Sequence, residues 1–153
     1  MIIRLALSDD VPVVAEIAQA AFEQYIAPIG RKPAPMLADY SRDVAAGHVH
    51  VIDVDGVIAG YATCYPKAGF MHLESVAVHP AFVGQGLGRR LVSHVERVAL
   101  DAGLRGVDLY TNAKMSGNLT LYPHLKYIEV DRRHENGFDR VYFRKDFQDD
   151  NRS

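Results

Sequence analysis

Three glycines at alternate positions, Gly84, Gly86 and Gly88, separate a stretch typical of a strand from a stretch typical of a helix. A chain that passes from a strand into a helix leaves several main-chain N–H groups without intrahelical acceptors, and the positive end of the helix dipole points to the same place. Such a place binds anions, and glycines let phosphate oxygens approach the amides. The sequence therefore indicates a phosphate-binding turn, made of Val83, Gly84, Gln85, Gly86, Leu87, Gly88 and Arg89.

The same glycine cluster has other interpretations. A cluster of this kind can form a tight turn that holds no ligand. The dinucleotide-binding fingerprint requires a third glycine where Arg89 stands, and the Gly-Lys-Ser/Thr ending of a P-loop is absent. Nor does Gly86 follow an N-terminal strand–helix start, which a Rossmann domain would require. The spacing disfavours a nucleotide site, and it leaves a phosphate-binding turn and a plain turn open.

The segments on either side of the turn predict alternating strands and helices. Apolar residues with a helical period predict an amphipathic helix that ends near Tyr25, and residues 26–36, with three prolines and a glycine, predict a loop. Asp55-Gly56 and Asn136-Gly137 are typical of type I′ hairpin turns. The predicted strands are 2–7, 48–54, 57–65, 70–78, 106–110, 126–133 and 138–147, and the further predicted helices are 37–46, 87–102 and 119–125.

The order of these elements is β-α-α-β-β-β-α-β-α-β-β. It predicts an α/β (α+β) fold with a mixed central sheet of about seven strands flanked by about four helices. A length of 153 residues suits one compact domain. We therefore expect a single domain over residues 1–147 and a polar tail over residues 148–153.

Composition and charge argue against several classes of protein. A net charge of −2 leaves no basic footprint for a dedicated nucleic-acid binder. The lone Cys64 cannot form an internal disulfide, the first residues lack the features of a signal peptide, and no window approaches the roughly 18 apolar residues of a membrane span. The seven histidines show no metal-ligand spacing, so we interpret them as surface or packing residues. We expect a cytoplasmic protein without a metal and without nucleic-acid or membrane partners.

The element order and two motifs resemble the GNAT family of N-acetyltransferases. The strand motif is Leu73-Glu-Ser-Val-Ala-Val-His-Pro80, and the turn motif is Val83-Gly-Gln-Gly-Leu-Gly88. The second motif is similar to the family signature Gln/Arg-x-x-Gly-x-Gly/Ala, except that Val83 stands where the family usually carries Gln or Arg. The resemblance covers nearly the whole chain. It implies an enzyme that moves an acetyl group from acetyl-coenzyme A to an amine.

The resemblance also implies where coenzyme A binds. The main-chain amides of the turn would wrap the pyrophosphate, and Arg89 or Arg90 would supply positive charge nearby. Asn118 would face the cofactor, and the amine would approach near the loop of residues 25–40 and the closing hairpin. The preceding strand would pair its main chain with the pantetheine arm through Val76, Ala77 and Val78.

Glu74 is the leading candidate for removing a proton from the acceptor amine. An amine with a pKa of about 10.4 is almost entirely ammonium at pH 7, so its nucleophilic form costs about 4.6 kcal/mol. Glu74 lies mid-strand among apolar residues, where partial burial would raise its pKa toward a useful value. The resemblance implies the same role, because many family members carry a carboxylate here. Asp108 and Glu129 are lesser alternatives, and a solvent-facing or ion-paired Glu74 remains open.

Tyr122 is the candidate for protonating the thiolate of coenzyme A as it leaves. The segment Asn118-Leu-Thr-Leu-Tyr122 resembles the family's Asn-to-Tyr segment on the helix that follows the fifth strand. By the same resemblance, a main-chain N–H near Val76 would stabilise the charge on the carbonyl oxygen. A tyrosine on a short helix can also serve packing alone.

Two functional hypotheses from different classes remain. The first is an acetyl-coenzyme A-dependent N-acetyltransferase that acts on a small-molecule or peptide amine. The second is a non-catalytic acyl-coenzyme A-binding or regulatory module, because a fold and its phosphate-binding turn can persist where the chemistry has been lost. A homodimer formed through edge strands or the final hairpin is also open.

Overall fold

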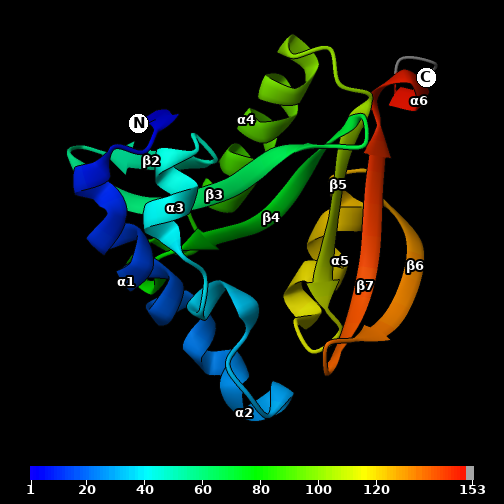
Figure 1. Cartoon of the computed structure of the whole chain (residues 1–153), viewed down its shortest axis with the longest axis horizontal. Helices are drawn as coiled ribbons and strands as arrows, with labels where there is room; N and C mark the ends of the chain where they lie inside the picture. Colours follow the sequence, from blue (N-terminus) through cyan, green and yellow to red (C-terminus); the bar gives the residue numbers. More distant parts are fainter. Residues whose placement is uncertain (151–153) are drawn as a thin grey trace. The chain divides into compact units, whose positions relative to one another are not determined.

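The computed structural model describes residues 1–150, and its seven strands form one mixed sheet (Figure 1). The strand order is β1-β2-β3-β4-β5-β7-β6, with β4 and β5 parallel. The strands are β1 (Ile2–Leu5), β2 (Val49–Val54), β3 (Val57–Lys67), β4 (Phe70–Val78), β5 (Gly106–Asn112), β6 (Ile128–Glu135) and β7 (Phe138–Asp146). The α-helices are α1 (Val11–Phe22), α2 (Ile26–Ile29), α3 (Tyr40–Ala45), α4 (Leu87–Asp101), α5 (Ser116–His124) and α6 (Phe147–Asp150).

The fold class predicted from the element order is confirmed. Among the described residues, α1, α3, α4 and α5 are the four helices of six residues or more. The predicted polar tail begins inside the short helix α6, and residues 151–153 lie outside the described residues.

The chain divides into two compact units. Unit 1 comprises residues 1–64 and 75–95, and unit 2 comprises residues 65–74 together with the chain from residue 96 onward. Each of the elements β3, β4 and α4 is divided between the two units, with one part in each.

The β2–β3 hairpin of unit 1 follows the turn chemistry of its sequence. Asp55 and Gly56 both have positive φ, 53° and 88°, as a type I′ turn requires. The hairpin closes on the pair Val54↔Val57, and β1 adds to β2 in an antiparallel ladder. The predicted hairpin is therefore confirmed.

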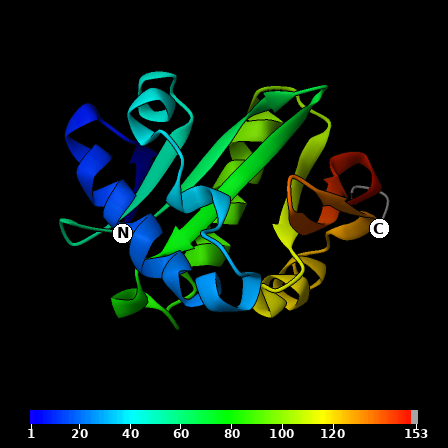
Figure 2. The ribbon, with the colours of Figure 1, turned by 60° about the horizontal axis from the view of Figure 1, so that its bottom comes forward.

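Helix α1 buries the apolar face that its sequence predicts. Pro12 stands in its first turn, and the side chains of Val14, Ile17, Ala18 and Phe22 are buried. The helix ends at Phe22 and continues as a short 3₁₀ turn to Tyr25. It packs beside α3, which in turn lies against β2 (Figure 2).

The predicted loop over residues 26–36 is wrong in part. Residues Ile26–Ile29 form α2, which ends where Gly30 takes a left-handed φ of 90°, and Ala34–Met36 form a 3₁₀ turn. The following helix begins at Tyr40 rather than at residue 37, because the Asp39 carboxylate accepts a hydrogen bond of 3.1 Å from the Arg42 N–H and caps it.

A buried histidine pair links β2 to α4 within unit 1. His50 is 8% exposed, and its Nδ1 lies 3.0 Å from Nε2 of His94, so one ring donates and the other accepts. Burial, with a smaller contribution from the charge of His94, lowers the pKa of His50 to about 4. Burial also lowers the pKa of His94. Both rings are therefore held neutral in the folded protein.

We expect this pair to make the fold sensitive to acid. The unfolded chain binds a proton near pH 6.5 and the folded His50 only near pH 4, so stability is full above about pH 6.5 and falls as the pH drops. Between pH 7 and pH 5 the loss should be on the order of 2 kcal/mol. Urea midpoints at the two pH values measure it. His50→Gln should reduce the loss, whereas the exposed His124→Gln should keep it; an unchanged loss in His50→Gln contradicts this account.

Unit 2 is built on β5, β7 and β6, which form an antiparallel sheet. The β6–β7 hairpin turns at Asn136 and Gly137, whose φ values of 54° and 81° confirm the predicted type I′ turn. Leu109 of β5 pairs with Phe143 of β7, and both side chains are buried. The next pair, Tyr110↔Tyr142, therefore presents its side chains on the other face of the sheet.

Helix α4 begins at Leu87 as predicted, and Gly103 follows its last turn with a φ of 75°. The buried stripe of α4 consists of Leu87, Leu91, Val92, Val95 and Ala99, which recur with the helical period of 3.6 residues.

Candidate active site

The glycine turn of unit 1 has the backbone that its sequence predicts. Residues Pro80–Phe82 form a 3₁₀ turn, which His79 caps by accepting a hydrogen bond of 3.0 Å from the Ala81 N–H. Gly84 and Gly86 then take φ values of 86° and 75°, in the left-handed region that favours glycine. Helix α4 starts at the next residue, Leu87.

The amides of this turn are available to an anion. Within residues 1–150, no protein atom accepts a hydrogen bond from the main-chain N–H groups of residues 84–89. The first helical bond runs from the Arg90 N–H to the Gly86 carbonyl, at 3.2 Å. A Cβ built on Gly84 or Gly86 meets no atom within 4 Å, so space is open beside both. This arrangement can hold a phosphate group.

The strand segment that precedes the turn is held by β3. The His79 N–H donates to the Ala59 carbonyl at 2.8 Å, and a Cβ on Gly60 would lie 2.6 Å from the Ala77 carbonyl oxygen. Glycine at position 60 is thus required by the close approach of the two strands. Ala77 is buried, whereas Val76 and Val78 are partly exposed. The main chain at Ala77 and His79 therefore lies directly against β3.

The expected burial of Glu74 is wrong. Glu74 is exposed, whereas Leu73 before it and Ala77 after it are buried. Glu129 is exposed as well, and a hydrogen bond of 2.9 Å from Arg132 holds the pKa of its carboxyl below the usual range.

Tyr122 lies in the interior of unit 2. It is 5% exposed, and its ring packs at 5.5 Å from the ring of Tyr127 and at 5.8 Å from that of Phe143. Burial raises the pKa of its phenol, so the hydroxyl keeps its proton throughout the neutral and mildly alkaline range. Such a group can donate a proton but does not readily accept one.

Asn118 lies on α5, the helix that also carries Tyr122. Its amide nitrogen donates to the Thr111 hydroxyl at 3.0 Å and lies 3.7 Å from the Met115 sulfur. The side chain therefore ties α5 to β5, in addition to any role toward a cofactor.

Comparison with known proteins identifies the family. Residues 14–127 match the sequence model of the acetyltransferase (GNAT) family, and this stretch contains β4, the glycine turn and α5. The chain belongs to this family. The sequence resemblance and the fold class inferred from it are thereby confirmed.

Several relatives of this GNAT chain are known. It is 39% identical over 72 residues to an amino-acid acetyltransferase of Ralstonia nicotianae, a match that covers 46% of the chain but only 16% of that protein. Among solved structures, the PaiA N-acetyltransferase of Thermoplasma acidophilum, in complex with coenzyme A, superposes with a TM-score of 0.79 at 13% identity, over 92% of this chain and 96% of that one. The ribosomal-protein-S18-alanine N-acetyltransferase of Escherichia coli gives 0.73 at 20% identity, over 95% and 92%. At such identities the structures establish the shared fold.

His72, predicted to be a surface or packing residue, is buried in this GNAT chain, and its Nδ1 lies 2.8 Å from a carboxylate oxygen of Asp108. The two residues stand 36 positions apart and meet because β4 and β5 pair in parallel. The sequence carries no short-range signal for this contact.

Proposed function

We propose that this GNAT protein is an acetyl-coenzyme A-dependent N-acetyltransferase whose acceptor is a primary amine. The observation that carries the proposal is the row of open amides at residues 84–89, placed at the start of α4 in a chain of this family. The amine nitrogen attacks the thioester carbonyl carbon, the C–S bond breaks, and coenzyme A leaves as a thiolate that takes up a proton.

Unit 1 supplies the groups for the cofactor. In this proposal the amides of residues 84–89 bind the pyrophosphate, and the exposed Arg89 adds positive charge. The main chain of Val76, Ala77 and Val78 pairs with the pantetheine arm. Val83 contributes its main chain alone, because a valine side chain forms no hydrogen bond with phosphate. The T. acidophilum N-acetyltransferase, which shares this fold, was solved in complex with coenzyme A, and this supports coenzyme A as the ligand.

Unit 2 supplies the groups for proton transfer. The acceptor amine must lose a proton, at a cost of about 4.6 kcal/mol at pH 7 for an ordinary alkylamine. Glu74 assists this step as an exposed carboxylate, which attracts the ammonium form of the acceptor. Tyr122 donates the proton that the leaving thiolate takes up, and Asn118 faces the cofactor from the same helix.

The proposal includes the location, the domain organisation and the partners of the protein. We propose a cytoplasmic enzyme with one acetyltransferase domain over residues 1–147 and a polar tail, acting on a small-molecule or peptide amine and not on nucleic acid or a membrane. A homodimer is compatible with this proposal. Among residues 1–150, no helix is long and apolar enough to cross a lipid bilayer.

The wild-type protein should release free thiol from acetyl-coenzyme A when a suitable amine is present. The measurement uses a thiol-reactive chromophore with a panel that contains a polyamine, an aminoglycoside, free amino acids and short peptides with free N-termini. Omission of the amine is the control. If calorimetry shows that acetyl-coenzyme A binds while no amine on the panel releases thiol, the protein is instead a non-catalytic acyl-coenzyme A-binding module.

A further inference from the structure

An imidazole–carboxylate pair lies on the β4–β5 ladder in unit 2. The two strands pair over Met71↔Val107 and His72↔Asp108. His72 is 8% exposed, and Asp108 is partly exposed. The imidazole is therefore more deeply buried than the carboxylate that it contacts.

The geometry fixes which nitrogen of His72 can accept a proton. Nδ1 lies 2.8 Å from Oδ1 of Asp108, so in the neutral ring this nitrogen carries the hydrogen and donates it to the carboxylate. Nε2 has no hydrogen-bond partner among residues 1–150, and its lone pair is available. When Nε2 takes a proton, the adjacent carboxylate stabilises the imidazolium that forms.

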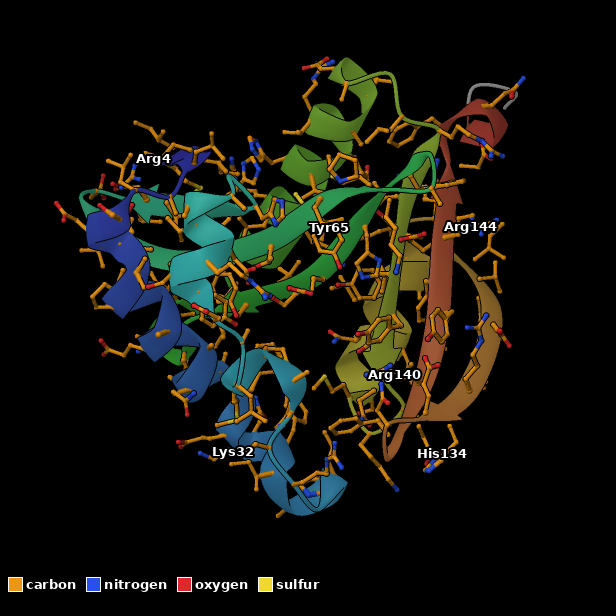
Figure 3. All side chains as sticks on the ribbon, in the orientation of Figure 1. Arg4, Lys32, Tyr65, His134, Arg140 and Arg144 are labelled. Atoms are coloured by element: carbon orange, nitrogen blue, oxygen red, sulfur yellow. The ribbon has the colours of Figure 1, made fainter. Side chains whose placement is uncertain are left out.

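Aromatic rings surround the pair and limit the access of water. The ring of Tyr65 lies 5.4 Å and that of Tyr110 lies 5.8 Å from the His72 ring. Tyr142 continues the row at 5.3 Å from Tyr110, and Arg140 lies over Tyr110 at 4.3 Å (Figure 3). The titratable or charged groups that face His72 and its immediate neighbours are thus Tyr65 of β3, Glu74 of β4, Asp108 and Tyr110 of β5, and Arg140 and Tyr142 of β7.

The position of His72 along β4 suits a role in acetyl transfer. Side chains at alternate positions of a strand share a face, so His72, Glu74 and Val76 point to the same side. Under the proposed function, Val76 belongs to the segment that pairs with the pantetheine arm. Glu74 and His72 precede Val76 by two and four residues on this face. They are therefore suited to meet the amine that attacks the thioester.

We propose that Nε2 of His72 is the proton acceptor for the amine, and that Asp108 is its positioning residue. This inference rests on the proposed function. The ammonium N–H bond breaks as the Nε2–H bond forms, and the neutral amine nitrogen then attacks the carbonyl carbon. The C–N bond forms, and the C–S bond breaks with its electron pair on sulfur. The thiolate takes the proton of the Tyr122 phenol, the second proton of the attacking nitrogen reprotonates the Tyr122 phenolate, and the His72 imidazolium releases its proton to water. Glu74 attracts the ammonium group, but the proton of that group goes to His72 and not to Glu74.

The chain contains a matched control for this pair. His134 and Asp139 on the β6–β7 hairpin form a second imidazole–carboxylate contact of 2.7 Å, and their side chains are 70% and 65% exposed (Figure 3). The two pairs share their chemistry and differ in burial. His134→Gln therefore reports the effect of losing a histidine–aspartate contact at the surface.

The test compares His72→Gln, Asp108→Asn, Glu74→Gln and His134→Gln in the thiol-release assay, with the best amine of the panel and over a range of pH. His72→Gln should lower kcat by about 100-fold while the Kd for acetyl-coenzyme A stays the same. The acidic limb of kcat/KM should disappear, because the variant lacks the group that must be deprotonated. Asp108→Asn should lower kcat and change the limb, whereas His134→Gln should keep the limb. Wild-type turnover in His72→Gln, or loss of the limb in Glu74→Gln alone, would overturn the inference.

Nitrogen NMR of the His72 ring tests the pair without turnover. We expect the neutral ring to carry its hydrogen on Nδ1 in the wild type and to lose this preference in Asp108→Asn. A wild-type ring with its hydrogen on Nε2 would overturn the inference, because that nitrogen could not accept a proton. Failure of the wild type itself to release thiol would instead count against the proposed function, so the two failures are distinguishable.

Discussion

Gly86→Val is expected to abolish binding of acetyl-coenzyme A. Gly86 has a φ of 75°, a conformation that a β-branched residue adopts only under strain of about 1–3 kcal/mol. The new side chain would also project into the open space beside the amides of residues 84–89. Strain and obstruction together should weaken the Kd by at least about 100-fold, which corresponds to about 2.7 kcal/mol. Isothermal titration of the folded variant with acetyl-coenzyme A measures the change.

Gly103→Val is the matched control for this substitution. Gly103 also has a φ of 75°, and a Cβ there meets no atom within 4 Å, but it follows the last turn of α4 instead of preceding the first. The two variants should lose similar thermal stability, and Gly103→Val should still bind the cofactor. Wild-type affinity in Gly86→Val, or an equal loss in both variants, would show that the turn does not bind the cofactor through its backbone.

Local turn chemistry explains why much of the fold is readable from the sequence. Asp55-Gly56 and Asn136-Gly137 specify type I′ turns, and both hairpins form with positive φ at each of these residues. The period of apolar residues likewise identified the buried face of α1. In each case the decisive interaction joins residues close in sequence, so a single chain is sufficient to predict it.

Elements that depend on capping were predicted less well. The prolines of residues 26–36 indicated a loop, but Pro28 lies inside the single turn of α2, and Gly30 ends that turn. Helix α5 begins at Ser116, three residues before the predicted start, because the Asn118 side chain ties its first turn to β5. A proline or a polar residue has different consequences at the first turn of a helix and in a loop, and tertiary contacts decide between them.

In the candidate site, too, the features set by neighbouring residues were predictable and those set by tertiary contacts were not. The glycine turn is a contiguous segment whose spacing and context made it predictable, and its open amides agree with the expectation. The exposure of Glu74 is not predictable from its apolar neighbours in sequence, because Leu73 and Ala77 of the same strand are buried while Glu74 is exposed. The His72–Asp108 contact depends on the register between β4 and β5, which only the folded chain defines.

Burial of Tyr122 makes its proposed role testable by the removal of one oxygen. Tyr122→Phe keeps the ring contacts with Tyr127 and Phe143, so the fold should be preserved. Without the phenol, the leaving thiolate lacks its proton donor, and kcat should fall by about 100-fold. The Kd for acetyl-coenzyme A should not change. Steady-state thiol release and calorimetry measure the two quantities.

The raised pKa of Tyr122 also predicts how kcat depends on pH if its phenol acts as the acid. Because burial keeps the phenol protonated, the wild type should show no alkaline decline of kcat in the range where an exposed tyrosine would ionise, near about pH 10. Tyr61→Phe is the control, since it removes another buried hydroxyl, one that lies 2.6 Å from the Tyr40 hydroxyl in unit 1. That variant should lose about 1 kcal/mol of stability and keep its kcat. Wild-type turnover in Tyr122→Phe would remove the tyrosine from the mechanism and leave protonation of the thiolate to water.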